Sequence, residues 1–172
     1  KTKINHLEFV FIDDFSTDGT FKFLKKYSKN KKFIKLIRNK KKGLGSAIQE
    51  GIKKSKFDYV CIFMCDMSDD IKDVIKYYNL ISKKNIDAVL GSRFIYKSKV
   101  KNYPLIKLVV NRIANNLIKI IFLSKYNDFT NAFKIYDRKV LLKFLPIVSE
   151  SFNVFLEIPL KIITRGYKYE II

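Results

Sequence analysis

Two adjacent carboxylates follow a short apolar run near the start of the chain. The run is FVFI at residues 9–12, and Asp13 and Asp14 come directly after it. A continuous apolar run suits a strand that is buried on both faces of a parallel sheet. In open α/β sheets, ligands bind beyond the carboxyl ends of the strands, so the two aspartates are candidates for holding a polar small molecule. In the alternative interpretation, the pair only caps the helix that follows.

A second group of acids follows the apolar run DYVCIFM at residues 58–64. Asp66, Asp69 and Asp70 lie just beyond it, and Ser68 stands among them. Carboxylates and neutral oxygens are the ligands that hard divalent cations prefer, so Asp66 and Ser68 are candidate metal ligands. In the alternative interpretation, Asp69 and Asp70 begin a helix, whose dipole favours acids at that end.

An arginine lies at a further strand exit. The run DAVL at residues 87–90 predicts a strand, and Gly91, Ser92 and Arg93 follow it. A guanidinium beside a glycine is well placed to bind a phosphate through two parallel hydrogen bonds. Three strand exits therefore carry acids, acids and an arginine, which one shared site explains better than chance.

A glycine pair precedes the second predicted helix. Residues 38–47 read RNKKKGLGSA and lead into a helix that ends near Lys54. In one interpretation, the glycines bring the backbone close to a ligand at the start of the helix, and the three lysines supply positive charge. The pair lacks the third glycine of a dinucleotide fingerprint and the Lys-Ser of a P-loop, so it is a weak signal for either. The alternative is a plain loop with a charged rim.

Apolar runs alternate with amphipathic segments, which predicts an α/β domain with a mostly parallel sheet flanked by helices. A length of 172 residues fits one domain with a real core. Beyond the elements named above, we expect strands at 33–37, 134–136 and 167–172, and helices at 20–29, 71–83, 105–123, 138–145 and 152–164.

The segment at 105–123 carries an apolar stripe with lysines, an arginine and asparagines between its apolar residues. It predicts an amphipathic helix, or two. One interpretation is that the segment packs against the sheet. The other is that it lies in a membrane interface, which cations flanking aliphatic residues favour.

The chain is strongly basic. Its 35 lysines and arginines exceed its 16 acidic residues, which gives a net charge of +19. Such a field attracts phosphates, nucleic acid or anionic lipid headgroups. The lysines are spread over almost every segment, however, which a genome-wide compositional bias also explains. The sequence has no recognised nucleic-acid-binding module and no clear basic stripe, so nucleic acid is not an expected partner.

The cysteine content and the hydropathy indicate the cell compartment. Cys61 and Cys65 have no second pair and no histidine nearby, so neither a zinc site nor a disulfide framework is indicated. A reduced, cytoplasmic setting is the expectation. No signal peptide opens the chain, and no run of about 18 apolar residues could span a bilayer.

A series of motifs, in order, matches one family. They are FVFIDDFSTDGT, N-x-x-x-GLGSAIQEG, CDMSDD, GSRF and DFTNAFK, followed by a helix with Glu157 and by RGYK. This series resembles the family-2 glycosyltransferases, and within them the dolichol-phosphate mannosyltransferase and polyprenyl-phosphate sugar transferase group. The likeness runs through nearly the whole chain, so residues 1–172 are expected to form one catalytic domain. The family's first strand and helix should precede Lys1 and are missing from this sequence.

The resemblance implies a GT-A fold, a nucleotide-sugar donor such as GDP-mannose or a UDP-hexose, a divalent cation (Mg²⁺ or Mn²⁺) and inversion at the anomeric carbon. The acceptor that it implies is a polyprenyl or dolichyl phosphate. Such an enzyme would lie peripherally at the cytoplasmic face of a membrane. Two alternatives stay open, which are transfer to a glycan or other hydroxyl, and a non-catalytic basic binding domain.

The resemblance also assigns donor-binding residues. Asp13 and Asp14 would contact the base or ribose of the donor, and Asn39 and Gly43 belong to the same donor-binding set. Asp66 stands at the second aspartate of the family's Asp-x-Asp motif, so it would bind the metal together with the diphosphate.

The metal site departs from the family pattern at one position. Met64 stands where the family has the first aspartate of Asp-x-Asp. The site therefore lacks one ligand unless Asp69 or Asp70 supplies it, with Ser68 as a neutral oxygen ligand.

Two residues are expected to act in catalysis. Arg93 would engage a donor or acceptor phosphate, and Asp128 is the acidic residue of the acceptor-side motif. Lys134 replaces an arginine often found there and is assigned to donor binding. Cations at the strand exits would stabilise the leaving diphosphate. A phosphate acceptor needs little base help, whereas a hydroxyl acceptor would need Asp128 as general base.

Overall fold

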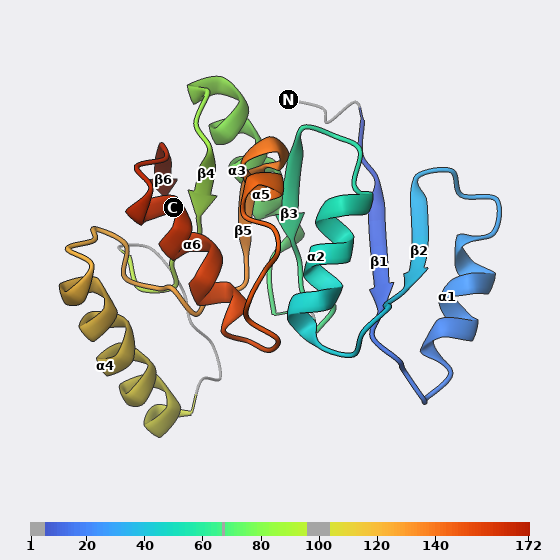
Figure 1. Cartoon of the computed structure of the whole chain (residues 1–172), viewed down its shortest axis with the longest axis horizontal. Helices are drawn as coiled ribbons and strands as arrows, with labels where there is room; N and C mark the ends of the chain where they lie inside the picture. The colour runs from blue at the N-terminus through green and yellow to red at the C-terminus, as the bar shows by residue number, and fades with distance from the viewer. Residues whose placement is uncertain (1–5, 67, 96–103) are drawn as a thin grey trace.

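The computed structural model describes residues 6–66, 68–95 and 104–172. Strands and helices form within a few residues of the predicted bounds, and the segment at 105–123 is a single helix (Figure 1). No helix in these described ranges is long and apolar enough to cross a membrane. The elements are β1 (Phe9–Asp13), α1 (Thr20–Ser28), β2 (Ile34–Arg38), α2 (Leu44–Lys54), β3 (Tyr59–Ile62), α3 (Ile71–Lys84), β4 (Ala88–Leu90), α4 (Leu105–Ile121), β5 (Lys134–Asp137), α5 (Arg138–Lys143), α6 (Val154–Thr164) and β6 (Tyr169–Ile171).

The described strands form two sheets. β1 and β2 pair in parallel, with Asp13 opposite Arg38. The second sheet has the order β3-β5-β4-β6. In it β4 and β6 are parallel, whereas β5 runs antiparallel to both of its neighbours, β3 and β4. The α/β class is confirmed, and β5 is the strand that departs from the parallel arrangement.

Helices cover both faces of the four-stranded sheet. In Figure 1, α2, α5 and α6 lie in front of it and α3 lies behind it. The larger apolar core includes Leu90, Tyr136 and Ile158. The smaller core includes Tyr77 and Ile81 of α3. Because both faces are covered, all three residues of β4 are buried, as its uniformly apolar sequence predicts.

β1 is less buried than its apolar sequence predicts. Phe9 is 40% exposed, and Asp13 is the one residue of the strand that is buried. Among the described strands, β2 alone pairs with β1, and α1 buries none of its residues over the sheet. The prediction of a strand buried on both faces is therefore wrong for β1, since four of its five residues are exposed or half-buried.

The loop between α5 and α6 is clamped against the start of α2. The Glu157 carboxylate accepts hydrogen bonds from the backbone N–H groups of Val148 and Ser149, at 3.1 and 2.7 Å. The N–H of Gly45 donates to the Glu150 carbonyl at 3.1 Å. A Cβ on Gly45 would lie 1.8 Å from the Ser149 carbonyl oxygen. The absence of a side chain on Gly45 therefore leaves room for the backbone of Ser149 and Glu150. The sequence predicted either a bound ligand or a plain loop near these glycines.

Candidate active site

Most of the predicted site residues lie along one edge of the two sheets. β1, β2, β3 and β4 all run toward the lower edge of the molecule in Figure 1. Asp13 ends β1, Asp66 follows β3, and Arg93 follows β4. Their polar side chains therefore gather at the carboxyl ends of the strands, where ligands bind in folds of this class.

Asp14, Asn39 and Gly43 form one hydrogen-bonded group at the end of β1. The Asp14 carboxylate accepts the N–H of Gly43, with both oxygens 3.0 Å away, and the side-chain amide of Asn39 at 2.8 Å. Asn39 is buried, and its side-chain oxygen accepts the Ser46 hydroxyl at 3.0 Å. The three predicted donor-binding residues are thus brought together, and their mutual bonds fix the loops between β1 and α2.

Asp13 differs from Asp14 because its carboxylate oxygens accept no hydrogen bond from a described residue. Its side chain is fully buried, and neither oxygen has a hydrogen-bond partner among the described residues. Nε of Arg38 lies 3.7 Å from Oδ2, which is the distance of an ion pair and too long for a hydrogen bond. A cavity of about 530 Å³ adjoins both aspartates and reaches Cys65 at the exit of β3, with Phe11 and Phe23 among its apolar walls. The acids after β1 therefore border a space that extends to the exit of β3.

The acids after β3 have different partners. Asp66 is exposed, and hydrogen bonds from Ser68, including its N–H at 3.0 Å, lower the pKa of Asp66. Asp70 accepts the N–H of Lys72 at 2.9 Å and caps α3, which confirms the helix-start interpretation for this residue. Burial, and next the charge of Asp66, raise the pKa of Asp69. Asp66 and Asp69 are thus the acids after β3 that do not cap α3.

The fit of a divalent cation rests on these two carboxylates. No group of three His, Cys, Asp or Glu side chains that could hold a metal forms within the described ranges. Met64 packs against the larger core and offers no ligand. Mg²⁺ in phosphate-transfer sites is usually bound by one or two carboxylates, the substrate phosphates and water. Asp66 and Asp69 could supply the one or two carboxylates that such a cation needs, and the metal site predicted at Asp66 and Ser68 stays a prediction.

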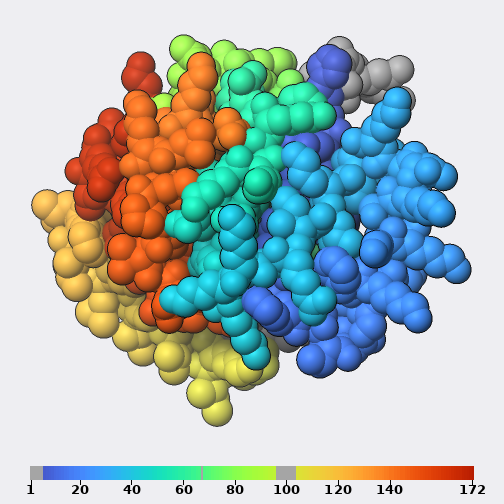
Figure 2. All heavy atoms as spheres, turned by 45° about the vertical axis from the view of Figure 1, so that its right-hand side comes forward, coloured from blue at the N-terminus to red at the C-terminus, as the bar shows by residue number. Residues whose placement is uncertain are grey.

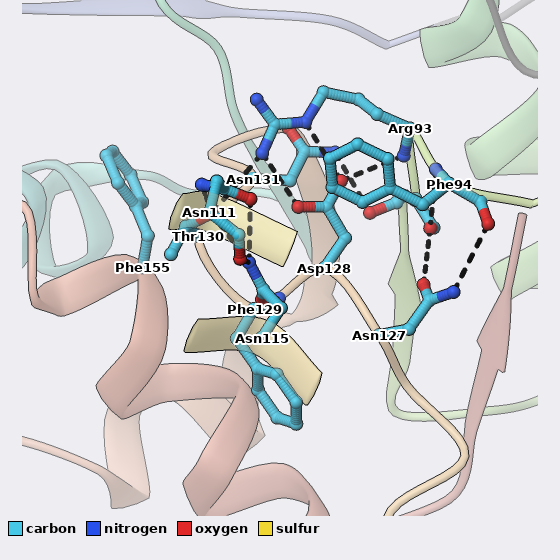
Figure 3. Close-up of polar contacts among 12 residues, drawn as sticks. Arg93, Phe94, Asn111, Asn115, Asn127, Asp128, Phe129, Thr130, Asn131 and Phe155 are labelled. Atoms are coloured by element: carbon cyan, nitrogen blue, oxygen red, sulfur yellow. Dashed lines mark hydrogen bonds and ion pairs between the residues drawn. The ribbon is translucent and has the colours of Figure 1, made fainter. Parts of the chain in front are cut away.

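Arg93 and Asp128 form an ion pair at the end of β4 (Figure 3). Nε and Nη2 of Arg93 donate to the two oxygens of Asp128, at 2.9 and 2.7 Å, and the backbone N–H of Arg93 adds a bond at 2.8 Å. The Asp128 side chain is fully buried, and that of Arg93 is 30% exposed. Both oxygens of Asp128 thus point at Arg93. This geometry suits orientation of the guanidinium and disfavours the predicted general-base role, which requires a carboxylate that faces the acceptor.

Two asparagines of α4 extend this network (Figure 3). The Thr130 hydroxyl lies 3.3 Å from Nη2 of Arg93 and accepts the Asn111 amide at 2.9 Å. Asn115 is completely buried, donates to the Asn111 carbonyl at 2.9 Å and accepts the N–H of Phe129 at 2.6 Å. These bonds attach α4 to the loop that carries Asp128.

A second cavity, of about 260 Å³, opens beside Arg93. Its polar lining comes from Arg93, Asn111, Thr130 and Asn153, and its apolar lining from Phe152, Phe155 and Leu156. The cavity thus combines a cation, amides and a hydroxyl with an apolar wall.

Lys134 lines neither of these cavities. It is 1% exposed, and its Nζ donates to the backbone carbonyls of Phe129, Asn131 and Phe155. Burial lowers the pKa of Lys134 to about 7, although the charge of Asp128 opposes the shift. The predicted donor-binding role of Lys134 is therefore corrected, because its ammonium group faces protein carbonyls and supports the loop at 129–131.

Asn111, Asn115 and Thr130 are site residues to which the sequence assigned no role. The sequence signal for the two asparagines is their spacing of four residues, which places both on one face of the helix. Thr130 lies two residues after Asp128 in the motif DFTNAFK, and the contact with Arg93 gives it a role.

Comparison with known proteins shows the family. The model of glycosyl transferase family 2 matches residues 2–145. Among curated relatives, the dolichol-phosphate mannosyltransferase of Pyrococcus furiosus is 32% identical over 108 residues, which are 62% of this chain and 30% of the relative. The cholesterol galactosyltransferase of Borreliella burgdorferi is 30% identical over 89 residues, which are 52% of this chain and 25% of the relative. The chain thus spans less than a third of the length of either.

Solved structures of glucosyl-3-phosphoglycerate synthase from Mycobacterium tuberculosis share the fold. The complex with phosphoglyceric acid has a TM-score of 0.69 at 15% identity, covering 95% of this chain and 58% of that one. The complex with Mn²⁺, UDP-glucose and phosphoglyceric acid has a TM-score of 0.68, covering 94% and 57%. At this identity the likeness concerns the fold, and it agrees with the expected GT-A architecture. Together with the match to most of its sequence, this fold shows that the chain belongs to glycosyl transferase family 2.

Proposed function

We propose that the chain carries the site of an inverting transferase, which moves a sugar from GDP-mannose or a UDP-hexose to a polyprenyl or dolichyl phosphate. The observation that carries the proposal is the guanidinium of Arg93, which Asp128 holds at a cavity with polar and apolar walls. Family membership supports the transfer of a sugar. Similarity to the dolichol-phosphate mannosyltransferase of Pyrococcus furiosus supports a lipid phosphate as the acceptor.

The donor would bind in the larger cavity, between the exits of β1 and β3. Asp13 retains two carboxylate oxygens without hydrogen-bond partners in the described chain, which suits the N–H groups of a base or the hydroxyls of a ribose. The apolar side chains of β1 and α1 would pack against the base. Asp14, Asn39 and Gly43 would act indirectly, because they bond to one another and fix the shape of the loop.

The donor's diphosphate would bind with a divalent cation at Asp66 and Asp69. Asp69 would supply the carboxylate that Met64 cannot, and the N–H of Ser68 would hold Asp66 in place. When bound, such a cation neutralises the charge that develops on the leaving diphosphate.

Arg93 would bind the acceptor phosphate. Nε and Nη2 of the guanidinium donate to Asp128, which fixes the plane of the group, and the phosphate oxygens would meet its Nη1–Nη2 edge. A phosphate monoester is an anion at neutral pH, so one of its oxygens can attack the anomeric carbon without a general base. The bond to the leaving diphosphate breaks as the new bond forms on the opposite face, which inverts the configuration.

The lining of the smaller cavity supports a lipid phosphate in particular. Phe152, Phe155 and Leu156 would receive the first apolar part of an isoprenoid chain. The hydroxyl of Thr130 and the amide of Asn111 would lie on the side of the headgroup. An acceptor with one charged end and one apolar end matches both walls.

Calorimetric titration tests the donor side of the proposal. We expect GDP-mannose or UDP-glucose to bind in the presence of Mn²⁺, and Asp66→Ala to abolish this binding. Glu170→Ala is the matched control, because this acid pairs with Lys84 and lines neither cavity. Binding that survives Asp66→Ala would refute the metal assignment. Failure of both donors to bind under every condition would count against both of them.

A further inference from the structure

Two walls of the Arg93 cavity come from separate parts of the chain. One wall is the loop at 129–131, whose Thr130 contacts Arg93, and the other is the segment at 152–156 around the start of α6. Figure 3 shows Phe155 of the second wall on the opposite side of Thr130 from Arg93. In Figure 2 the segment from α5 to α6 lies at the surface next to α2. The width of the cavity therefore depends on what ties this surface segment to the loop.

The ammonium group of Lys134 joins the two walls. In the loop it donates to the carbonyls of Phe129, at 3.1 Å, and of Asn131. In α6 it donates to the carbonyl of Phe155, at 3.4 Å. That carbonyl receives no helical hydrogen bond, because Pro159 stands four residues later and has no N–H. The three N–H groups of the ammonium therefore have one carbonyl each.

The surroundings of Lys134 make it a rigid anchor. Its strand, β5, pairs on both sides, and Lys134 lies opposite Ile62 of β3 and Leu90 of β4. The residue is 1% exposed, so water does not replace a bond that breaks. The loop is also held from its other side, because the side-chain amide of Asn131 donates to the Gly91 carbonyl at 2.9 Å. Both walls are thus fixed to the central strands.

We propose that Lys134 is a positioning residue of the Arg93 cavity, because its ammonium group sets the separation between the loop at 129–131 and the start of α6. Lys134 does not line the cavity, so it acts through Thr130 and Phe155 and touches no substrate. The proposal rests on the proposed function for its kinetic readout alone. Hydrogen exchange needs no substrate, so it tests the positioning even where the wild type transfers no sugar.

The proton on Lys134 matters for this role, since a neutral amine has only two N–H groups for three carbonyl oxygens. Burial lowers the pKa of Lys134 to about 7, with Asp128 opposing the shift. Of the more distant charges, Arg93 lowers this pKa and Asp69 raises it. Tyr126, whose ring centre lies 5.8 Å from Nζ, stays neutral because burial raises its pKa. The connection between the walls is therefore expected to weaken above about pH 7.

Hydrogen exchange followed by mass spectrometry tests the connection directly. Peptides that cover residues 127–133 and 153–157 are compared at about pH 6 and about pH 9, after correction for the intrinsic pH dependence of exchange. We expect protection of both segments to fall by more than about tenfold at the higher pH in the wild type. In Lys134→Arg, whose guanidinium stays charged, it should change by less than about twofold. Helix α3 is the internal control. Equal pH dependence in the two proteins would overturn the proposal.

Steady-state kinetics separate positioning from a merely structural role. We expect Lys134→Met to raise the KM for polyprenyl phosphate by more than about tenfold and the KM for the nucleotide sugar by less than about twofold. Lys139→Met, at an exposed position in α5, is the matched control and should change neither. Circular dichroism establishes that the variants are folded. Where Lys134→Met does not fold, the pH dependence of the wild type and of Lys134→Arg still decides. Equal rises in the two KM values would overturn the proposal.

Discussion

The orientation of the Arg93 guanidinium depends on one carboxylate. Asp128 is buried, and both of its oxygens accept N–H groups from Arg93. An asparagine at this position keeps the shape of the side chain but turns an N–H₂ group toward the arginine. This substitution therefore distinguishes two possible roles of Asp128, which are orienting Arg93 and accepting a proton.

We expect Asp128→Asn to lower kcat/KM for transfer by about 10²-fold, because the fork of Arg93 loses its fixed direction. The KM for the nucleotide-sugar donor should change little. Steady-state kinetics with each substrate varied in turn measure both quantities. Asp137→Asn, which keeps a good capping residue at the start of α5, is the control. A mutant that loses only the acidic limb of its pH–rate profile would instead show that Asp128 accepts a proton, and would favour a hydroxyl acceptor.

The sequence identified the residues around the end of β1 and did not reveal how they divide their work. Asp13, Asp14, Asn39 and Gly43 were all expected to bind the donor, and the fold brings them together. The bonds from Asn39 and Gly43 to Asp14 join residues 25 and 29 positions apart. Which aspartate receives them depends on the path of the loop, and neither residue type nor spacing encodes that path.

At the scale of elements, the start of α2 packs closely against the loop before α6. We expect Gly45→Ala to lower the free energy of unfolding by about 3 kcal/mol, because the new Cβ would meet the Ser149 carbonyl oxygen. Gly51→Ala in the same helix is the matched control, since its Cβ would meet only Ile12 at an ordinary 3.7 Å. That variant should be neutral or more stable by up to about 1 kcal/mol. Urea denaturation measures both, and equal effects would contradict the close approach.

Glu157 fixes the same loop through its charge. Burial acts to raise its pKa, but hydrogen bonds from Lys161, Ser149 and Val148 outweigh burial and hold the pKa at about 2. The ordinary value is 4.5. Because the folded pKa is the lower one, the stabilisation is complete above the ordinary value and is lost as the pH falls toward 2.

We therefore expect Glu157→Gln to lower the free energy of unfolding by about 2 kcal/mol at neutral pH, and by much less below about pH 3. Denaturant titrations of both proteins across this range measure the difference. Glu150→Gln, an exposed acid in the same loop that pairs with Lys41, should change stability little at any pH. A difference between wild type and Glu157→Gln that does not vary with pH would contradict the assignment.

Pro159 illustrates what a helix pattern can and cannot predict. Pro159 lies inside α6, and a proline there predicts a distortion because it has no N–H for the carbonyl four residues earlier. That carbonyl belongs to Phe155, and Nζ of Lys134 donates to it at 3.4 Å. The sequence shows the missing donor, whereas the lysine that replaces it comes from β5 and is found only in the fold.

At the scale of the whole molecule, the orientation of α4 was the feature least accessible to prediction. The periodicity of residues 105–123 defines an apolar and a polar face, and it is the same whichever face turns inward. The hydrogen bonds of Asn115 turn the polar face of α4 inward, and they require the loop at 129–131 to be in place. The α/β class, by contrast, follows from the order of apolar runs, since each run is long enough to form one strand.

In the proposed reaction, Arg93 recognises the phosphate of a lipid acceptor. The most direct measurement compares transfer from a labelled nucleotide sugar to polyprenyl phosphate and to the corresponding alcohol, with wild type and Arg93→Lys. We predict transfer to the phosphate alone, with kcat/KM about 10²-fold lower in Arg93→Lys, because lysine lacks the planar fork. Arg138→Lys, whose guanidinium donates to Ser55 outside the site, should retain activity. Equal transfer to the alcohol, or full activity in Arg93→Lys, would show that Arg93 does not recognise the acceptor phosphate.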